Sequence, residues 1–295
     1  MDQILAAPYI PSPGHTEQPL VGEAETNLGE VELVDLPGIY TLSASSEDEI
    51  IARDYLLSGE ADLVIDIVDA TNLERNLYLT LQLIEMGLPI LVVLSKMDMA
   101  RKEGLSIDVD HLSKHLDAPV VAISAVTGDG IKATRGALQR ALLDRRTSSA
   151  SVSYPAPVND VSAQWESCLK PGADDYGVTS RWLALQLLEG NAALTSRVVE
   201  ADLLDYGDIQ DAQSRVEKEA GDEADIILAD ARYGFIHGVA KDVMKRGISR
   251  KRFTEVIDRF ALSRVTGIPI FLGVMYLVFW FTISVGGAFI DFFDI

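Results

Sequence analysis

Three short apolar runs, rich in β-branched residues, constrain the fold of this chain more than any other feature. They cover residues 63–68, 90–94 and 120–123, and helical spacing of apolar residues follows them at 76–86, 111–116 and 132–143. Buried strands that alternate with helices are typical of a mostly parallel α/β sheet. Residues 31–34 predict a further strand and residues 46–57 a further helix. In such a sheet, ligands bind at the carboxyl ends of the strands.

The chain changes character after residue 143. Residues 144–160 have the Ser-, Thr- and Pro-rich composition of a linker. Beyond them the alternation of strands stops, and apolar residues at helical spacing predict helices over 181–189, 195–218 and 223–246. We therefore expect an α/β domain at residues 1–146, a linker at 147–159 and an all-helical domain at 160–262.

Residues 268–290 form a run of 23 residues without a charge. About 20 such residues are enough to cross a bilayer, so we expect a transmembrane helix over residues 266–290, with a buried core helix as the alternative. Eight basic residues lie between Lys241 and Arg264, before this run, and only two acidic residues follow it. Basic flanks are retained in the cytoplasm, so we expect the bulk of the chain to be cytoplasmic and its carboxyl terminus periplasmic.

The composition excludes several classes of protein. The net charge of −20 argues against a non-specific nucleic-acid binder, which needs a basic face. Cys168 is the single cysteine, which excludes an internal disulfide, and beside Trp165 we expect it to be a buried small hydrophobe. His111 and His115 could share a helix face and bind a metal. No third ligand is near them in sequence, so we expect two solvated histidines instead.

Three short segments directly follow predicted strands, at residues 35–38, 95–98 and 123–125. In the first, the carboxylate of Asp35 could hold a magnesium-bound water, and the amide of Gly38 could approach a terminal phosphate. In the second, Asp98 could accept two hydrogen bonds from a guanine edge. An isolated Asp-x-Pro-Gly is usually an ordinary turn. Three segments in this order, each after a strand, match the layout of a GTP-binding domain.

The second and third segments would form the base site. The stem of Lys96 can lie over the base, and a backbone amide of Ser124 or Ala125 can meet the guanine oxygen. The residues predicted to bind guanine are Ser95, Lys96, Met97, Asp98, Ile123, Ser124 and Ala125.

Longer stretches resemble one known family. The most specific is residues 69–83, Asp-Ala-Thr-Asn-Leu-Glu-Arg-Asn-Leu-Tyr-Leu-Thr-Leu-Gln-Leu, and shorter matches lie at 34–40, 55–59, 181–185, 230–233, 267–271 and 275–276. On these residues the chain resembles ferrous iron transport protein B, FeoB, from about residue 13 onward. The resemblance implies a P-loop-NTPase-like G domain, a helical regulatory domain and the first transmembrane helix of a ferrous iron transporter.

The resemblance also supplies phosphate-site residues. Pro13-Gly14-His15-Thr16 fits the family's interval before Asp-x-Pro-Gly, so Thr16 would be the switch threonine that reaches magnesium. The residues predicted for the phosphates and Mg²⁺ are therefore Gly14, Thr16, Asp35, Leu36, Pro37 and Gly38.

Some positions depart from what such a site needs. The sequence contains no Gly-rich loop ending in Gly-Lys-Ser or Gly-Lys-Thr, which would cradle the phosphates. We therefore expect a G domain truncated at its start, with weakened binding of GTP or GDP and Mg²⁺. Ser95 stands where the family has Asn, and we expect it to be too short to brace the loop and to reach the base. Ile39 replaces a water-orienting Gln, as in the family, so fast hydrolysis is not expected and no catalytic residue is assigned.

The expected function is the nucleotide-binding regulatory part of an inner-membrane Fe²⁺ transporter. The expected partners are guanine nucleotide, the membrane and the remainder of the transporter's membrane region, with Fe²⁺ as the transported ion and no iron ligand in this chain. Two alternatives remain: a nucleotide-free remnant acting as a membrane-tethered interaction module, and a soluble assembly-type GTPase, against which residues 268–290 count.

Overall fold

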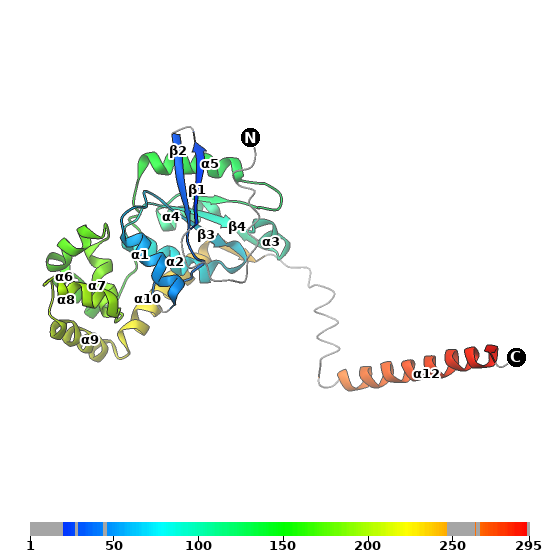
Figure 1. The fold of residues 1–295 in the computed structure, drawn as a ribbon. Coiled ribbons are helices and arrows are strands. Elements are labelled where there is room, and N and C mark those ends of the chain that lie inside the picture. The colour runs from blue at the N-terminus through cyan, green and yellow to red at the C-terminus, as the bar shows by residue number, and fades with distance from the viewer. Residues whose placement is uncertain (1–19, 27–28, 44–45, 247–262, 264–265, 294–295) are drawn as a thin grey trace. The chain divides into compact units, whose positions relative to one another are not determined.

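The computed structural model of this chain describes residues 20–26, 29–43, 46–246, 263 and 266–293 (Figure 1). The chain divides into two compact units, Met1–Lys245 and Arg246–Ile295. The first unit holds a sheet with flanking helices and a group of further helices. The second holds one long helix.

The central sheet has three parallel strands in the order β3-β4-β6, namely β3 (Val64–Asp69), β4 (Ile90–Ser95) and β6 (Val120–Ala122). These are the apolar runs of the sequence, which confirms that prediction. All residues of β4 except its last are buried, as expected of a strand between two parallel neighbours. The register sets Asp69 opposite Ser95, so the carboxyl ends of β3 and β4 coincide.

The helices that accompany the sheet are α1 (Glu47–Leu57), α2 (Leu73–Met86), α3 (Met97–Lys102), α4 (Val109–Leu116) and α5 (Ile131–Asp144). The short 3₁₀ helix η1 (Ala70–Asn72) leads into α2. α2 buries Leu73, Leu77 and Leu81 at helical spacing and ends at Gly87, whose φ of 83° is left-handed. α1 begins where the Ser46 side chain accepts the N–H of Glu49.

An antiparallel hairpin precedes α1. Its strands are β1 (Leu20–Thr26) and β2 (Gly29–Asp35), and they form a two-stranded sheet of their own. β2 contains the strand predicted over residues 31–34, whereas β1 is not predicted, because the many prolines and glycines of the first 30 residues hide a short strand.

The second half is helical, with α6 (Ala156–Asp175), α7 (Ser180–Leu188), α8 (Ala192–Glu200), α9 (Tyr206–Ala220) and α10 (Ala224–Val243). Figure 1 shows α6 to α9 as one group of helices beside α1. Buried apolar residues of these helices belong to the same core cluster as those of α2 and β4. The two parts of this unit therefore share one core.

Four details of this half differ from what the sequence predicts. α6 begins at Ala156, within the predicted linker, because Pro155 has a φ of −56° that suits a helix start. The helix expected over 195–218 is two helices, interrupted at Asp202, whose φ is 56°. The helix expected over 223–246 ends at Val243, and β7 (Met244–Arg246) then pairs with β5 (Leu105–Ile107). The predicted buried environment of Cys168 is wrong, since this residue is exposed on α6.

The second unit contains α12 (Gly267–Phe293). Its window Gly267–Ser284 has a mean hydropathy of 1.9. By length and composition this helix is able to cross a membrane.

Candidate functional site

The carboxyl ends of β4 and β6 lie side by side because these strands are parallel neighbours. The N–H of Ile123 donates to the carbonyl of Leu94 at 2.8 Å, and the N–H of Met97 donates to the carbonyl of Ile123 at 3.3 Å. The hydroxyl of Ser124 donates to Oδ1 of Asp98 at 2.9 Å. The structure therefore brings together the two segments that were predicted to contact guanine.

Asp98 lies in the first turn of α3, with its side chain partly exposed. The hydrogen bond from Ser124 lowers the pKa of Asp98, and Lys102, whose Nζ lies 3.5 Å from Oδ2, acts in the same direction. The carboxylate is therefore ionised at neutral pH. An ionised carboxylate is a pure acceptor and can take two N–H groups from one edge of a ligand.

Ser95 braces the loop that carries Asp98. Its hydroxyl donates to the carbonyl of Val68, at the end of β3, over 3.1 Å. The expectation that serine is too short to brace this loop is wrong, because the parallel register brings the β3 backbone within reach of a short side chain. The next residue, Lys96, has a left-handed backbone with a φ of 56°, which turns the chain into α3.

The loop after β6 closes on Ser124. The N–H of Ser124 donates to the carbonyl of Asp129 at 3.0 Å, and the N–H of Gly128 donates to the carbonyl of Ser124 at 2.8 Å. Gly130 has a φ of 84°, and a Cβ there would lie 2.0 Å from the carbonyl oxygen of Ala122. Only glycine fits this position without displacing the backbone. Gly130 is not among the residues predicted for the site, although the pair of glycines around Asp129 is a signal for a tight turn.

The segment after β2 is more open. Asp35 and Gly38 are exposed, while Leu36 and Pro37 are partly buried. Space remains around Gly38, since a Cβ added there would meet nothing within 4 Å. The predicted residues Gly14 and Thr16 lie outside the described residues.

Beyond Gly38 this segment contacts α2. The N–H of Leu42 donates to Oε1 of Gln82 at 2.8 Å, and both residues are buried. A cavity of about 550 Å³ lies beside this contact, and its lining joins the segment, α2 and the helical half. Its lining includes Tyr40, Thr41, Tyr78, Gln82, Gln186 and Asn191.

A buried ion-pair cluster connects α2 with the helical half. Arg232 of α10 is fully buried and pairs with Glu85 of α2 at 2.9 Å and with Glu189 at the end of α7. The hydroxyl of Tyr154 donates to the other oxygen of Glu85. Burial raises the pKa of Glu189, while Glu189 and Glu85 outweigh burial at Arg232 and raise its pKa. This cluster is not predicted from the sequence.

Comparisons with known proteins decide the family. The family model described as "Ferrous iron transport protein B" matches residues 12–138, and the model "FeoB cytosolic helical domain" matches residues 154–245. The chain belongs to the FeoB family. The resemblance that the sequence analysis drew from residues 34–83 and 181–233 is confirmed.

Three relatives illustrate the match. The Fe(2+) transporter FeoB of Escherichia coli strain K12 is 40% identical over 289 residues, which cover 96% of this chain and 36% of that protein. The cytosolic domain of T. maritima FeoB in a GDP form has a TM-score of 0.66 at 30% identity, over 79% of this chain and 88% of that one. NFeoB from S. thermophilus bound to mGMPPNP gives 0.65 at 33% identity, over 80% and 88%. The chain thus spans about a third of the curated transporter's length.

The two histidines of α4 lie beside each other in this FeoB chain. The ring centroids of His111 and His115 lie 4.6 Å apart with the rings tilted by 36°, and Nε2 of His115 lies 3.5 Å from Asp242 of α10. His115 is therefore partly buried against α10 rather than solvated. Among the described residues, no group of three or more His, Cys, Asp or Glu could hold a metal ion.

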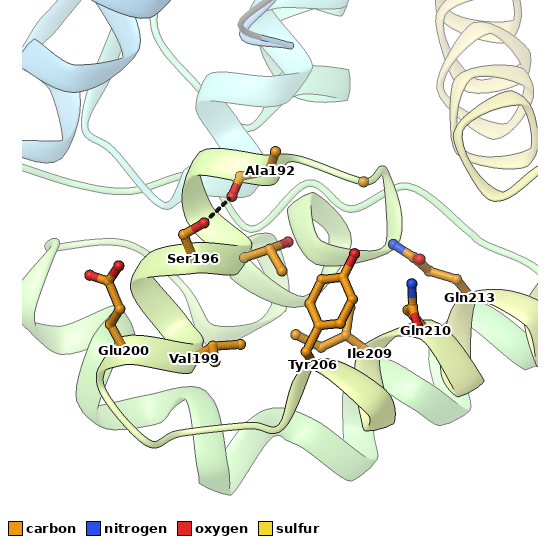
Figure 2. Close-up of a pocket in the computed structure, with 10 residues that line it drawn as sticks. Ala192, Ser196, Val199, Glu200, Tyr206, Ile209, Gln210 and Gln213 are labelled. Atoms are coloured by element: carbon orange, nitrogen blue, oxygen red, sulfur yellow. Dashed lines mark hydrogen bonds between the residues drawn. The ribbon is translucent and has the colours of Figure 1, made fainter.

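A second cavity of about 550 Å³ lies within the helical domain, between α8 and α9 (Figure 2). Figure 2 shows the hydroxyl of Ser196 bonded to the carbonyl of Ala192, with Tyr206 and Gln210 facing α8 from α9. None of the residues predicted to bind a nucleotide lines this cavity. It is separate from the strand-end site.

Proposed function

We propose that this chain binds a guanine nucleotide at the carboxyl ends of β2, β4 and β6. The observation that carries the proposal is the contact between Ser124 and Asp98, which joins two loops and holds a charged, partly exposed acceptor. Two solved relatives support it, since one is named as a GDP form and another as bound to mGMPPNP.

In this proposal Asp98 accepts two N–H groups of the guanine edge. The stem of Lys96 lies against the face of the base, and the amides of Ser124 and Ala125 face the guanine oxygen. Ser95, Met97 and Ile123 hold these groups in place through the hydrogen bonds described above.

The phosphates would lie toward Asp35 and Gly38. Asp35 is an exposed carboxylate at the end of a strand, and carboxylate oxygens suit Mg²⁺. Gly38 has open space where a phosphate can approach its amide. Mg²⁺ would supply charge neutralisation of the phosphates when bound. Leu36 and Pro37 shape the turn, and Gly14 and Thr16 are proposed from sequence alone.

We infer further that nucleotide state regulates Fe²⁺ uptake by a membrane region to which this part belongs. The contact of Leu42 with Gln82 links the segment after Gly38 to α2, and Glu85 on α2 pairs with Arg232 of the helical domain. A change at the phosphates would thereby reach the helical domain. For the domain limits we propose 1–146 for the α/β domain and 266–290 for the membrane helix, with the helical domain beginning at α6 (Ala156) rather than at residue 160.

The membrane arrangement is part of this proposal. α12 would cross the inner membrane with the carboxyl terminus in the periplasm, since the basic residues lie before it. A reporter active only in the periplasm, fused after Ile295, should be active. A fusion active only in the cytoplasm should be inactive, and the reverse pattern would contradict the orientation.

The nucleotide site is tested by Asp98→Asn in the full chain. The side chain of Asn presents an NH₂ donor in place of one of the two acceptor oxygens of Asp. GDP affinity should therefore fall by at least about tenfold while xanthosine diphosphate binds better. Asp110→Asn changes an exposed first-turn carboxylate of α4 and serves as the matched control. Equal affinities of the wild type and Asp98→Asn for both nucleotides would refute the base site.

A further inference from the structure

The ammonium group of Lys96 is tethered to the end of the neighbouring strand. Its Nζ lies 2.7 Å from Oδ2 of Asp69, the last residue of β3. The other oxygen of Asp69 accepts the N–H of Thr71 at 2.8 Å and the hydroxyl of Thr71 at 2.7 Å. Each oxygen of Asp69 therefore has its own role: one caps η1 and the other holds Lys96.

Both members of this pair are charged at neutral pH. Burial disfavours the carboxylate of Asp69, but the hydrogen bonds from Lys96 and Thr71 outweigh it and lower its pKa. The hydrogen bond to Asp69 raises the pKa of Lys96. The carboxylate is mostly enclosed, with 19% of its side chain exposed, whereas 55% of the Lys96 side chain is exposed. The enclosed carboxylate of Asp69 is thus able to orient the more exposed side chain of Lys96.

We propose that Asp69 is a positioning residue for guanine recognition, and this inference rests on the proposed function. By holding Nζ, Asp69 fixes the four methylene groups of Lys96 as an apolar surface against which a purine face can lie. A free lysine would lose rotamer freedom on binding, and that loss weakens affinity. Because Asp69 already holds Lys96, much of this loss of rotamer freedom occurs before the nucleotide binds. Ser95, bonded to the carbonyl of Val68, anchors the same loop one residue earlier.

The ion pair with Asp69 also limits the role of the Lys96 ammonium group. This ammonium group pairs with Asp69, so in this proposal the head group is not free to contact the base or a phosphate. The recognising groups for the purine edge remain Asp98 and the amides after β6, while Lys96 contributes shape.

A double-mutant cycle tests this role in the full chain. GDP dissociation constants are measured by calorimetry for the wild type, Asp69→Asn, Lys96→Met and the double variant. Asn keeps an oxygen for Thr71 and loses the ion pair, so Asp69→Asn should weaken GDP about threefold to tenfold. Methionine keeps an apolar stem without a charge. In the Lys96→Met background, Asp69→Asn should therefore change GDP affinity by less than about 1.5-fold.

Two further measurements separate positioning from a general structural effect. Asp62→Asn removes an exposed ion pair with Arg145, at 2.9 Å, and should leave GDP affinity unchanged. Magnetic resonance of isotope-labelled lysine should show that the pKa of the Lys96 amine falls in Asp69→Asn.

The outcomes distinguish this inference from the function on which it rests. A wild type that does not bind GDP would overturn both. A wild type that binds GDP, with an Asp69→Asn variant that binds equally well, would overturn only the role of Asp69. The same holds if the two substitutions weaken GDP binding additively, or if the pKa of Lys96 does not change.

Discussion

Two regions of the molecule use charged side chains in opposite ways. One is the contact between the α/β and helical domains, and the other is formed by the loops after β4 and β6, which we call the base-recognition end. At the domain contact, Arg232 is fully buried and is paired with two carboxylates. At the base-recognition end, Lys96 and Lys102 are mostly exposed, and each pairs with one carboxylate. Buried charges depend on every partner, whereas exposed charges are screened by water. Substitutions at the first place should therefore change stability, and substitutions at the second should change binding.

The largest effect is expected for Arg232→Met. It leaves Glu85 and Glu189 buried without their cation, and breaking a buried pair in this way costs about 3–5 kcal/mol. Urea unfolding of the detergent-solubilised chain, followed by tryptophan fluorescence, measures the loss, since Trp165 and Trp182 are buried in the helical domain.

Arg181→Met is the matched control for that experiment. Arg181 is exposed and donates to the carbonyl of Val152 and to Asn159. Its replacement should cost less than about 1 kcal/mol. Equal losses for the two arginine variants would mean that burial does not distinguish the domain contact.

Gly130→Ala should have the next largest effect, and it should lower both stability and GDP binding. The new Cβ would lie 2.0 Å from the carbonyl oxygen of Ala122, at a left-handed backbone position. We expect a loss of about 3 kcal/mol and weaker GDP binding, because the loop of Ser124 must move. Gly128→Ala has the same backbone handedness, with a φ of 77° and open space, and should cost about 1 kcal/mol. Similar losses of stability for Gly130→Ala and Gly128→Ala would indicate that backbone strain, and not the close contact with Ala122, causes the loss.

Much of this arrangement follows from the sequence, and the reasons differ by element. The strands Val64–Asp69 and Ile90–Ser95 are predictable because their apolar, β-branched runs have no competing helical pattern. The base-site segments are predictable because polar residues directly follow these strands. The interruption at Asp202 was missed because it comes from a left-handed residue within a periodic pattern.

Long-range pairs could not be predicted. Asp69 and Lys96 are separated by 27 positions, and Glu85 and Arg232 by 147. Only the register of parallel strands and the packing of α10 against α2 bring these charges together. A single sequence gives each carboxylate several equally plausible partners, so the pairs emerge only from tertiary structure.

Asp66 is a buried carboxyl group that has no cationic partner among the described residues, and we expect it to make stability depend on pH. It lies on β3, is buried, and accepts the hydroxyl of Thr80 at 2.5 Å. Burial raises the pKa of Asp66 from 3.8 to about 6, against the opposing hydrogen bond. Because the folded state holds this proton more tightly than the unfolded state, stability should fall as pH rises from about 4 to about 6 and then level off.

Asp66→Asn should remove that fall and stabilise the protein at pH 7 by about 3 kcal/mol. Asn can still accept the hydroxyl of Thr80. Unfolding measured at pH 4.5 and pH 7 for both proteins checks this, and an equal pH dependence of the two would show that Asp66 is not the titrating group.

Lys102→Met should have the smallest effect, because Lys102 is more exposed than the other two paired cations, Lys96 and Arg232. Lys102 is 74% exposed, and its Nζ lies 3.5 Å from Asp98, four residues earlier on α3. Water and salt screen such a pair, and Ser124 already holds the other oxygen of Asp98. The melting temperature should shift by about 1 °C or less, and GDP affinity should change less than about twofold, with the difference vanishing at high salt. A larger loss of affinity that persists in high salt would show that Lys102 contacts the nucleotide itself. The base-recognition end would then depend on its exposed charges as strongly as the domain contact depends on Arg232.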